Sequence, residues 1–429
     1  MTEVTQVPEW LTKPPTVNAN MPAWLLKHRA KHWDAFLKNG LPTQRNERWK
    51  YTDLSFLTQK DFASALPVEA HEISNLVNQH RLQKDDSILL TMVNGYFMPA
   101  LSDLKMFPDN AIICDFDTAW QENAELLKAL DATVIDTKQY PFASLNIAKA
   151  ASGLFIHLPK DCKLNKPVHL LSLMVGNEEL IAHPQHLLML GENSELTLVE
   201  EFVGNADQTY LMNVMTTIFL EKNAQLDSFK MQHDGEQAVH VANKFVYQKQ
   251  DSNAHFTHFA VGGIFAREDI AIQLQEAGAN CKTAGFYRLQ RDNQYIDNHV
   301  DIFHVAPRSN SEMLYKGILD KKSRAVFNGR LYVERDAQKI LAYQANHNLL
   351  LSNQAEVYSK PELEIYADDV KCKHGASTGQ LDQEALFYLR SRGIPLVEAM
   401  NILLRGFSEE VIKRVTHPGV KLRVQEILA

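Results

Sequence analysis

A four-residue pattern recurs through the middle of the chain at intervals of 30 residues. Asn193-Ser-Glu-Leu196, Asn223-Ala-Gln-Leu226 and Asn253-Ala-His-Phe256 each form a polar corner that leads into apolar–polar alternation. Gly278-Ala-Asn-Cys281 continues the series after a slightly shorter interval. Alternation is typical of strands, and a repeat of this length indicates a solenoid, whose rungs bury their apolar faces only by stacking on neighbours. We therefore expect a mainly β fold with a β-helix, although a large antiparallel sandwich would also place strands at short intervals.

Helical patterns flank the repeat region on both sides. Before it, apolar residues at helical spacing run from Pro22 to Gly40. After it, we expect one helix at 382–391, a second from Pro395 to Gly406, and a third capped by Ser408. The expected division of the chain is a mainly helical N-terminal region at 1–153, the β-helix core at 154–352 and a C-terminal helical domain at 353–429.

Two aromatic residues interrupt an otherwise polar segment between Gly40 and Leu54. These are Trp49 and Tyr51, which stand among charged and amide side chains. We expect this segment to be a connector that is held to the fold by burial of its rings.

Length, charge and cysteine content exclude several classes of protein. A chain of 429 residues is too long for one ordinary core, and a formal net charge of −8 argues against sequence-independent nucleic-acid binding. No apolar stretch is long enough to span a bilayer, and residues 1–8 do not have the pattern of a secretory signal. The four cysteines are scattered without a Cys-x-x-Cys pair, which excludes the usual local zinc and ferredoxin spacings and suits a reducing compartment. We expect a cytoplasmic globular protein.

The best pair of candidate metal ligands is Cys372 and His374. A soft sulfur and an imidazole stand two residues apart, so in an extended strand both would point to the same side. Lys371 and Lys373 flank the cysteine and are expected to favour its thiolate. Zinc and iron–sulfur sites usually take four protein ligands. Either this is not a metal site, or distant residues or another chain supply the remaining ligands.

A second candidate lies in the segment that ends at His304. As a strand, this segment would present Asp297, His299 and Asp301 on one face, which resembles a cupin-like metal site. A solvated strand face is the more ordinary interpretation. The chain contains no phosphate loop, no G-x-S-x-G elbow and no H-E-x-x-H motif. We therefore expect a non-catalytic scaffold or binding protein that binds no nucleotide itself.

Several separate segments, in the same order, resemble the SufB/SufD family of iron–sulfur cluster assembly proteins. The Trp49-Lys-Tyr-Thr52 segment and Cys372-Lys-His-Gly-Ala-Ser-Thr-Gly379 resemble SufD-type chains in particular. Gly375 stands where SufB-type chains carry a carboxylate that is implicated as a cluster ligand. The resembling segments cover most of the chain and are Gly40–Leu54, Tyr315–Gly317, Ser323–Gly329, Gln344–Ser352, Pro361–Ile365 and Ala367–Phe407.

The resemblance implies a right-handed parallel β-helix flanked by helical regions, and a set of partners. Such a chain would pair with SufB through the β-helices and bind one copy of the ABC-type ATPase SufC through its C-terminal helices, in a complex of one SufB, two SufC and one SufD. ATP-driven dimerisation of SufC would expose Cys372 and His374 to iron and sulfur, as candidate ligands of a transient iron–sulfur cluster at the interface. The residues expected to contact the ATPase are Leu386, Phe387, Leu389, Ile402, Leu403, Leu404 and Phe407.

Three other interpretations stay open. The chain could be SufB-type, the primary scaffold, although Gly375 argues against that. It could be a cupin-like metalloenzyme that uses Asp297, His299 and His304. It could also be a homodimeric solenoid without metal chemistry, because a β-helix face built to meet a related partner can pair with itself.

Overall fold

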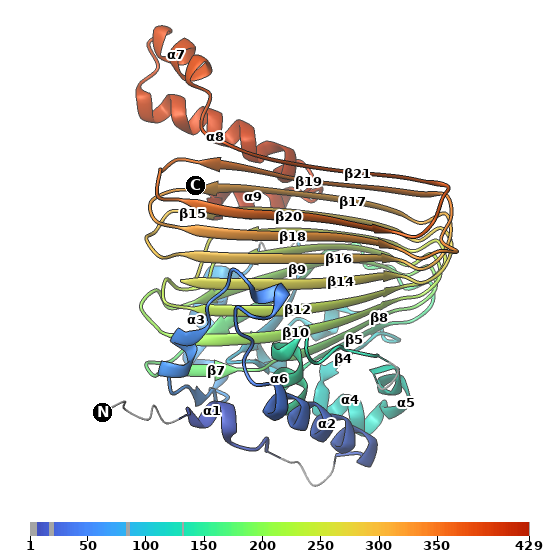
Figure 1. Ribbon diagram of the computed structural model, residues 1–429. Helices are drawn as coiled ribbons and strands as arrows, with labels where there is room; N and C mark the ends of the chain where they lie inside the picture. The colour runs from blue at the N-terminus through green and yellow to red at the C-terminus, as the bar shows by residue number, and fades with distance from the viewer. Residues whose placement is uncertain (1–6, 17–20, 83–85, 131–132, 429) are drawn as a thin grey trace.

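The centre of the molecule is a parallel β-solenoid of about eight turns, with helices at both ends (Figure 1). The computed structural model describes residues 7–16, 21–82, 86–130 and 133–428. The prediction that the chain carries no secretory signal rests partly on residues 1–6, which lie outside these ranges. The solenoid confirms the fold class expected from the repeat and excludes the antiparallel sandwich.

Each turn contributes one strand to each of two sheets, here called sheet A and sheet B. Neighbouring strands pair in parallel along both sheets, except for the antiparallel pairs β4–β5 and β2–β3 at one end. Sheet A contains β4 Ile112–Asp115, β5 Gly153–Leu158, β8 Gln185–Leu190, β10 Tyr210–Leu220, β12 Val239–Gln248, β14 Phe265–Leu274, β16 Tyr295–His304, β18 Arg324–Val333 and β20 Glu356–Ile365, with β1 Ala63–Ser64 and β7 Leu180–Ala182 off the main path. Sheet B contains β2 Ile88–Val93, β3 Tyr96–Phe97, β6 Val168–Met174, β9 Glu195–Gly204, β11 Gln225–Gln232, β13 Asn253–Ala260, β15 Asn280–Leu289, β17 Asn310–Leu319, β19 Ile340–Leu350 and β21 Val370–Gly379.

The asparagines of the repeat lie at the corners where the chain turns from sheet A to sheet B. Asn193 and Asn223 both have a φ of 58°, in the left-handed region that asparagine tolerates better than most residues. The Asn223 amide donates to Oδ1 of Asn193 at 3.0 Å, and the Asn193 amide donates to Oδ1 of Asp161 at 2.7 Å. The repeat therefore marks a ladder of corners, one for each rung.

The third copy of the repeat is offset from this ladder. The strand register pairs Gln225 with Asn253 and Asn253 with Asn280, so the rungs there are 28 and 27 residues long. Asp251, with a φ of 55°, takes the left-handed position that the sequence pattern gives to Asn253. Gly278 takes it in the next rung, with a φ of 79°.

The main core lies between the two sheets, where alternate residues of each strand point inward. Two tyrosine rings fit there because the residue paired with each on the neighbouring strand is glycine. A Cβ on Gly317 would lie 2.1 Å from the Tyr287 ring, and a Cβ on Gly285 would lie 2.2 Å from the Tyr315 ring. These two glycine–tyrosine pairs fill the interior of neighbouring rungs.

The N-terminal region covers the outer face of sheet A and one end of the solenoid (Figure 1). It is not purely helical, because β2 and β4 join the two sheets. Trp49 is buried, as expected for the connector, and the half-buried Tyr51 stacks on Tyr358 of β20 with ring centroids 4.4 Å apart. The helices of this region are α1 Glu9–Thr12, α2 Ala23–Asn39, η1 Glu47–Trp49, η2 Ser55–Gln59, α3 Ala70–His80, η3 Pro99–Leu101, η4 Leu104–Met106, α4 Phe116–Glu122, α5 Ala124–Leu127, η5 Lys128–Leu130 and α6 Pro141–Lys149.

The C-terminal part differs from the expectation in two ways. First, β20 and β21 extend the solenoid to Gly379, well past residue 352, and the helices begin only with α7 Gln383–Ser391. Second, α8 spans Leu396–Ile412 and α9 spans Pro418–Leu428, so neither the end at Gly406 nor the cap at Ser408 is correct. Ser408 lies buried inside α8, where its hydroxyl donates to the Arg405 carbonyl at 3.0 Å. None of the helices in the described ranges combines the length and apolarity of a membrane span.

Candidate functional site

The solenoid ends in two strands that each expose one edge. β20 pairs with β18 and β21 pairs with β19, and in the described part of the chain nothing pairs with their other edges (Figure 1). Both strands are ten residues long. An open edge of this length offers unpaired backbone N–H and C=O groups to another chain.

Cys372 and His374 lie on β21, on the side that faces the interior of the solenoid. The register places Cys372 beside Ala342 and His374 beside Gln344, both buried inward-facing positions of β19. Cys372 is half-buried against the main core, whereas His374 is exposed because no further rung covers it. The expectation that both side chains share one side is confirmed.

The expected activation of Cys372 by its neighbours is wrong. Lys371 and Lys373 alternate with Cys372 along the strand, so they point to the outer face rather than toward the sulfur. Burial raises the pKa of the Cys372 thiol. In the chain by itself, the sulfur is therefore held in its protonated form rather than as a thiolate.

The two candidate ligands are not joined by further ligands from this chain. Within the described ranges, no three histidine, cysteine, aspartate or glutamate side chains are grouped so that they could hold a metal ion. Gly375 follows directly, and a Cβ built there would meet nothing within 4 Å. The end of the solenoid thus places a thiol and an imidazole, two of the four ligands that a zinc or iron–sulfur site usually takes, on a rung that no further strand covers.

The second candidate segment, on β16, is neither a metal site nor a solvated face. Asp297, His299 and Asp301 do share the outer face of sheet A, but each is almost fully buried under the N-terminal region. His299 contacts Asp297 at 2.8 Å. The hydroxyls of Ser309 and Ser311 form hydrogen bonds of 2.8 and 2.9 Å with the two ring nitrogens of His304. His304 lies on the opposite, inward face of β16, so it does not converge with Asp297 and His299, and the described residues form no cupin-like ligand set.

Two arginines that the sequence analysis did not single out neutralise this buried cluster. Arg267 of β14 is fully buried and pairs with Asp297 and, at 2.6 Å, with Asp269. Arg48 of η1 reaches Asp301 at 2.6 Å and Asp269 at 2.9 Å. The sequence did carry a signal, since three ionisable residues on a strand between apolar neighbours require counter-charges if that face is buried.

The same cluster fixes the connector that contains Trp49. The Arg267 guanidinium lies 3.6 Å from the centre of the Trp49 ring, and the Thr52 hydroxyl donates to Asp297 at 2.6 Å. Tyr295 of β16 donates to the Tyr51 carbonyl at 2.7 Å. The connector is therefore attached to the outer face of sheet A by buried polar contacts as well as by its rings.

The apolar residues expected to contact the ATPase divide into an exposed and a packed group. Phe387 and Ile402 are exposed by 74% and 42%, on a helical hairpin of α7 and the start of α8 that projects from the solenoid (Figure 1). Leu386, Leu389 and Leu403 are half-buried. Leu404 and Phe407 instead pack against the outer face of sheet B. The hairpin also exposes three apolar residues that the sequence analysis did not name, namely Tyr388, Leu396 and Val397.

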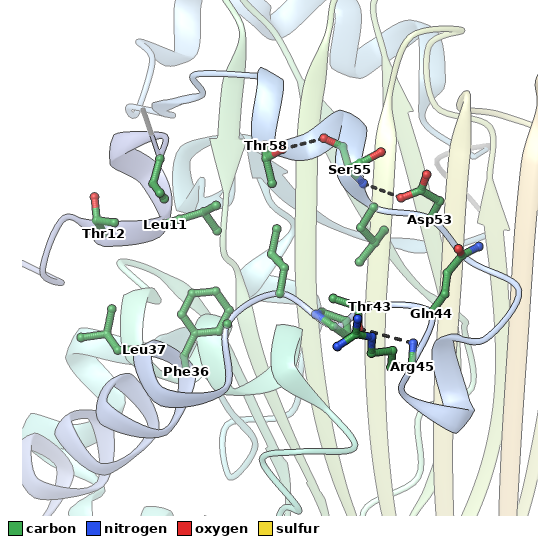
Figure 2. A pocket seen from close by; sticks show the side chains of 15 residues that line it. Leu11, Thr12, Phe36, Leu37, Thr43, Gln44, Arg45, Asp53, Ser55 and Thr58 are labelled. Carbon is green, nitrogen blue, oxygen red and sulfur yellow. Dashed lines mark hydrogen bonds between the residues drawn. The ribbon is translucent and has the colours of Figure 1, made fainter. Parts of the chain in front are cut away.

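A pocket of about 840 Å³ lies in the N-terminal region, between α1, the end of α2 and the connector (Figure 2). Its walls include Leu11, Phe36 and Leu54, with Arg45 and Asp53 among the polar residues. Neither Cys372 nor His374 contributes to it, and its lining contains no histidine or cysteine. It is thus separate from the candidate ligands at the end of the solenoid.

Comparisons with known proteins agree with this architecture. Residues 173–407 match the family model described as SUF system FeS cluster assembly, SufBD core domain, and residues 11–170 match the SufBD protein N-terminal region. The chain is 33% identical to the iron–sulfur cluster assembly protein SufD of Escherichia coli, over 93% of this chain and 90% of that protein. It is 30% identical to an iron–sulfur cluster assembly SufBD family protein of Synechocystis, over 91% of this chain and 87% of that protein. The chain therefore belongs to the SufB/SufD family of iron–sulfur cluster assembly proteins, as a SufD-type member.

Proposed function

We propose that this chain is a non-catalytic scaffold subunit of a cytoplasmic iron–sulfur cluster assembly complex. It pairs with a SufB-type chain through the open edges of β20 and β21. The observation that carries the proposal is the position of Cys372 and His374 beside open space on the last rung. A partner that covers this rung can bring the missing ligands to them, and a nascent cluster or iron is then held between the two chains as cargo.

The raised pKa of the Cys372 thiol fits such a role. A protonated, half-buried thiol is a poor metal ligand and a poor nucleophile, and it becomes a ligand when an incoming metal displaces its proton. The cysteine is therefore protected in the chain by itself. It becomes useful for iron acquisition only where a partner and a metal arrive together.

The projecting hairpin of α7 and α8 is the proposed binding site for a SufC-type ATPase. Phe387, Tyr388 and Val397 are exposed by 57% to 74% on this hairpin, far more than a packed helix requires. In the proposed complex of one SufB, two SufC and one copy of this chain, nucleotide-driven dimerisation of the ATPases pulls on this hairpin. In isolation, the open solenoid edge permits two copies of the chain to pair.

Native mass spectrometry of the chain co-expressed with the SufB and SufC proteins of the same cell tests the assembly. We expect a complex of one SufB, two SufC and one copy of this chain. We also expect Phe387→Asp to remove one ATPase from it, while Leu422→Asp, which changes an exposed leucine on α9, leaves the complex intact. A chain that remains a lone homodimer with its own bound metal would refute the proposal.

The ligand role of His374 is tested in the assembled complex. We expect His374→Ala to leave the fold and the stoichiometry unchanged and to lower the yield of reconstituted cluster several-fold, measured by its visible absorption and by iron and sulfide content. His255→Ala is the matched control, because His255 is half-exposed at a distant corner, where it pairs with Asp227. Normal cluster yield from the His374 variant would remove this residue from the mechanism.

A further inference from the structure

Glu201 is a fully buried carboxylate on the outer face of sheet B, at a point where three parts of the chain meet. His169 of β6 contacts its Oε2 through Nε2 at 3.0 Å, and His233, which follows β11, contacts its Oε1 through Nε2 at 2.8 Å. Arg423 of α9 donates to the same Oε1 at 2.6 and 3.0 Å. Although burial alone would raise it, the contacts with His169 and His233 hold the pKa of Glu201 well below its usual range.

The N-terminal region reaches the same cluster through His80, at the end of α3. The Arg423 guanidinium lies 3.2 Å from Nδ1 of His80, which can only accept a hydrogen bond from it. The backbone N–H of Leu82 similarly donates to Nδ1 of His169 at 3.4 Å, which leaves Nε2 of His169 to contact Glu201. Burial, together with the charge of Arg423, lowers the pKa of His80.

Arg423 brings the permanent positive charge of this cluster from α9. It contacts Glu201 beside His169 and His233. Departure of α9 from the sheet would remove this cation from a carboxylate that is fully buried in the folded chain. Loss of one partner of a buried ion pair is costly, so the contact adds to the apolar packing that holds α9 on sheet B.

The polar contacts of helix α8 with the solenoid are less buried than the Arg423–Glu201 contact of α9, although α8 also packs apolar side chains on sheet B. Lys316 of β17 donates to the Phe407 carbonyl at 3.2 Å and pairs with the half-exposed Glu410 at 2.5 Å. Arg414 pairs with Glu312, which is also partly exposed. Solvent screens these pairs, whereas the Glu201 carboxylate is fully buried. The projecting hairpin is thus the distal end of a lever, and the contact of α9 with Glu201 is its most deeply buried polar attachment.

We infer that the Arg423–Glu201 contact is the coupling through which movement of the ATPase-binding helices is transmitted to the solenoid. This inference rests on the proposed function, since it requires an ATPase to move the hairpin. A lever transmits a displacement only if its attachment is stiffer than the interface that it moves. With Arg423 in place, a pull on α7 and α8 turns the solenoid and disturbs its open edge. Without it, the same pull displaces α9 from sheet B. Arg423 is therefore a positioning residue, remote from the cluster ligands.

The test compares Arg423→Gln with Lys413→Gln, a change at an exposed lysine of the same helical domain. In the chain alone, we expect hydrogen exchange of the α9 amides to accelerate at least tenfold in Arg423→Gln and to stay unchanged in Lys413→Gln. In the complex, we expect both variants to bind the ATPase within twofold of the unmodified chain. ATP should accelerate the alkylation of Cys372 in the unmodified complex, with a Cys372→Ser chain giving the background of the other thiols. We expect Arg423→Gln to lose most of this acceleration and Arg423→Lys, which keeps the charge, to retain part of it.

The outcomes separate the inference from the proposed function. If Arg423→Gln shows the full ATP-dependent alkylation, or unchanged exchange of α9, the coupling role is wrong while the assembly role stands. If the unmodified complex does not form, or ATP never changes the alkylation of Cys372, the proposed function fails, and the coupling role fails with it. Alkylation measured without ATP shows whether Arg423→Gln has lost its structure, because unfolding would expose Cys372 in the absence of nucleotide.

Discussion

Replacement of Arg267 by methionine measures how strongly the connector is attached to sheet A. The Arg267 side chain is fully buried, and its guanidinium pairs with Asp269 and Asp297. The change leaves Asp297 with only Thr52 and His299 as polar neighbours, and it removes the cation from the face of Trp49. Removal of one partner of a buried ion pair costs about 3–5 kcal/mol. We therefore expect the free energy of unfolding in urea to fall by about that amount.

A control on β18, two strands away from β14 in sheet A, separates the effect of burial from that of charge pairing. Arg324 of β18 pairs with Glu356 at 2.8 Å, but the two side chains are 44% and 49% exposed. Exposed pairs contribute about 0–1 kcal/mol, so Arg324→Met should change the unfolding free energy by less than 1 kcal/mol. The double variant Arg267→Met/Asp297→Asn should recover about 1–3 kcal/mol, because it removes the charge that the single variant leaves unpaired.

Two results would refute this reasoning. One is an Arg267→Met variant that loses no more stability than Arg324→Met. The other is a double variant that recovers nothing, since the cost would then come from lost packing rather than from an unpaired carboxylate. Limited proteolysis provides an independent measure, because the segment around Trp49 should become cleavable only in Arg267→Met.

Three further predictions concern the solenoid. Gly317→Ala places a Cβ 2.1 Å from the Tyr287 ring and should cost about 1–3 kcal/mol in urea unfolding, whereas Gly375→Ala, with nothing within 4 Å, should cost nothing measurable. At the left-handed corner, Asn223→Val should lower the free energy of unfolding by about 1–2 kcal/mol, whereas Asn223→Gly should leave it near that of the unmodified chain. Equal losses in the two variants would show that the left-handed backbone is not what makes position 223 sensitive. Burial lowers the pKa of His186 to about 4, so the free energy of unfolding should fall as the pH drops from about 6.5 toward 4. The expected loss between pH 7 and pH 5 is about 2 kcal/mol. His186→Gln should remove that part of the pH dependence.

The features that the sequence predicts well depend on local geometry. The corners are visible because a left-handed residue recurs where the chain turns from sheet A to sheet B, and asparagine takes this position at Asn193 and Asn223. The shared side of Cys372 and His374 follows from the alternation of a single strand. Neither inference requires knowledge of distant contacts, and the structure confirms both.

The features that the sequence does not predict depend on contacts between distant segments. Arg48 lies 253 residues before Asp301 along the chain, so the buried character of the β16 face is invisible until the fold is known. The sequence pattern predicts a helix end at Gly406. The helix continues instead, because packing of the neighbouring Leu404 and Phe407 outweighs the low helix propensity of glycine, and a Cβ at Gly406 would meet nothing within 4 Å.

The last rung, formed by β20 and β21, is not predicted from the sequence, and the reason is relevant to function. Apolar alternation marks a strand whose side chains are covered by another rung, and β20 and β21 have none above them. Their composition is that of a protected edge, because β20 contains Pro361 and outward carboxylates, and β21 carries Lys371 and Lys373. Proline and charged residues keep an open edge from pairing indiscriminately. In the proposed complex, the same residues restrict the edge to a partner that matches them in charge, so that Cys372 and His374 meet their missing ligands only in the correct assembly. The polar composition that keeps β20 and β21 from being predicted as strands is thus the composition expected of an edge that pairs with one specific partner.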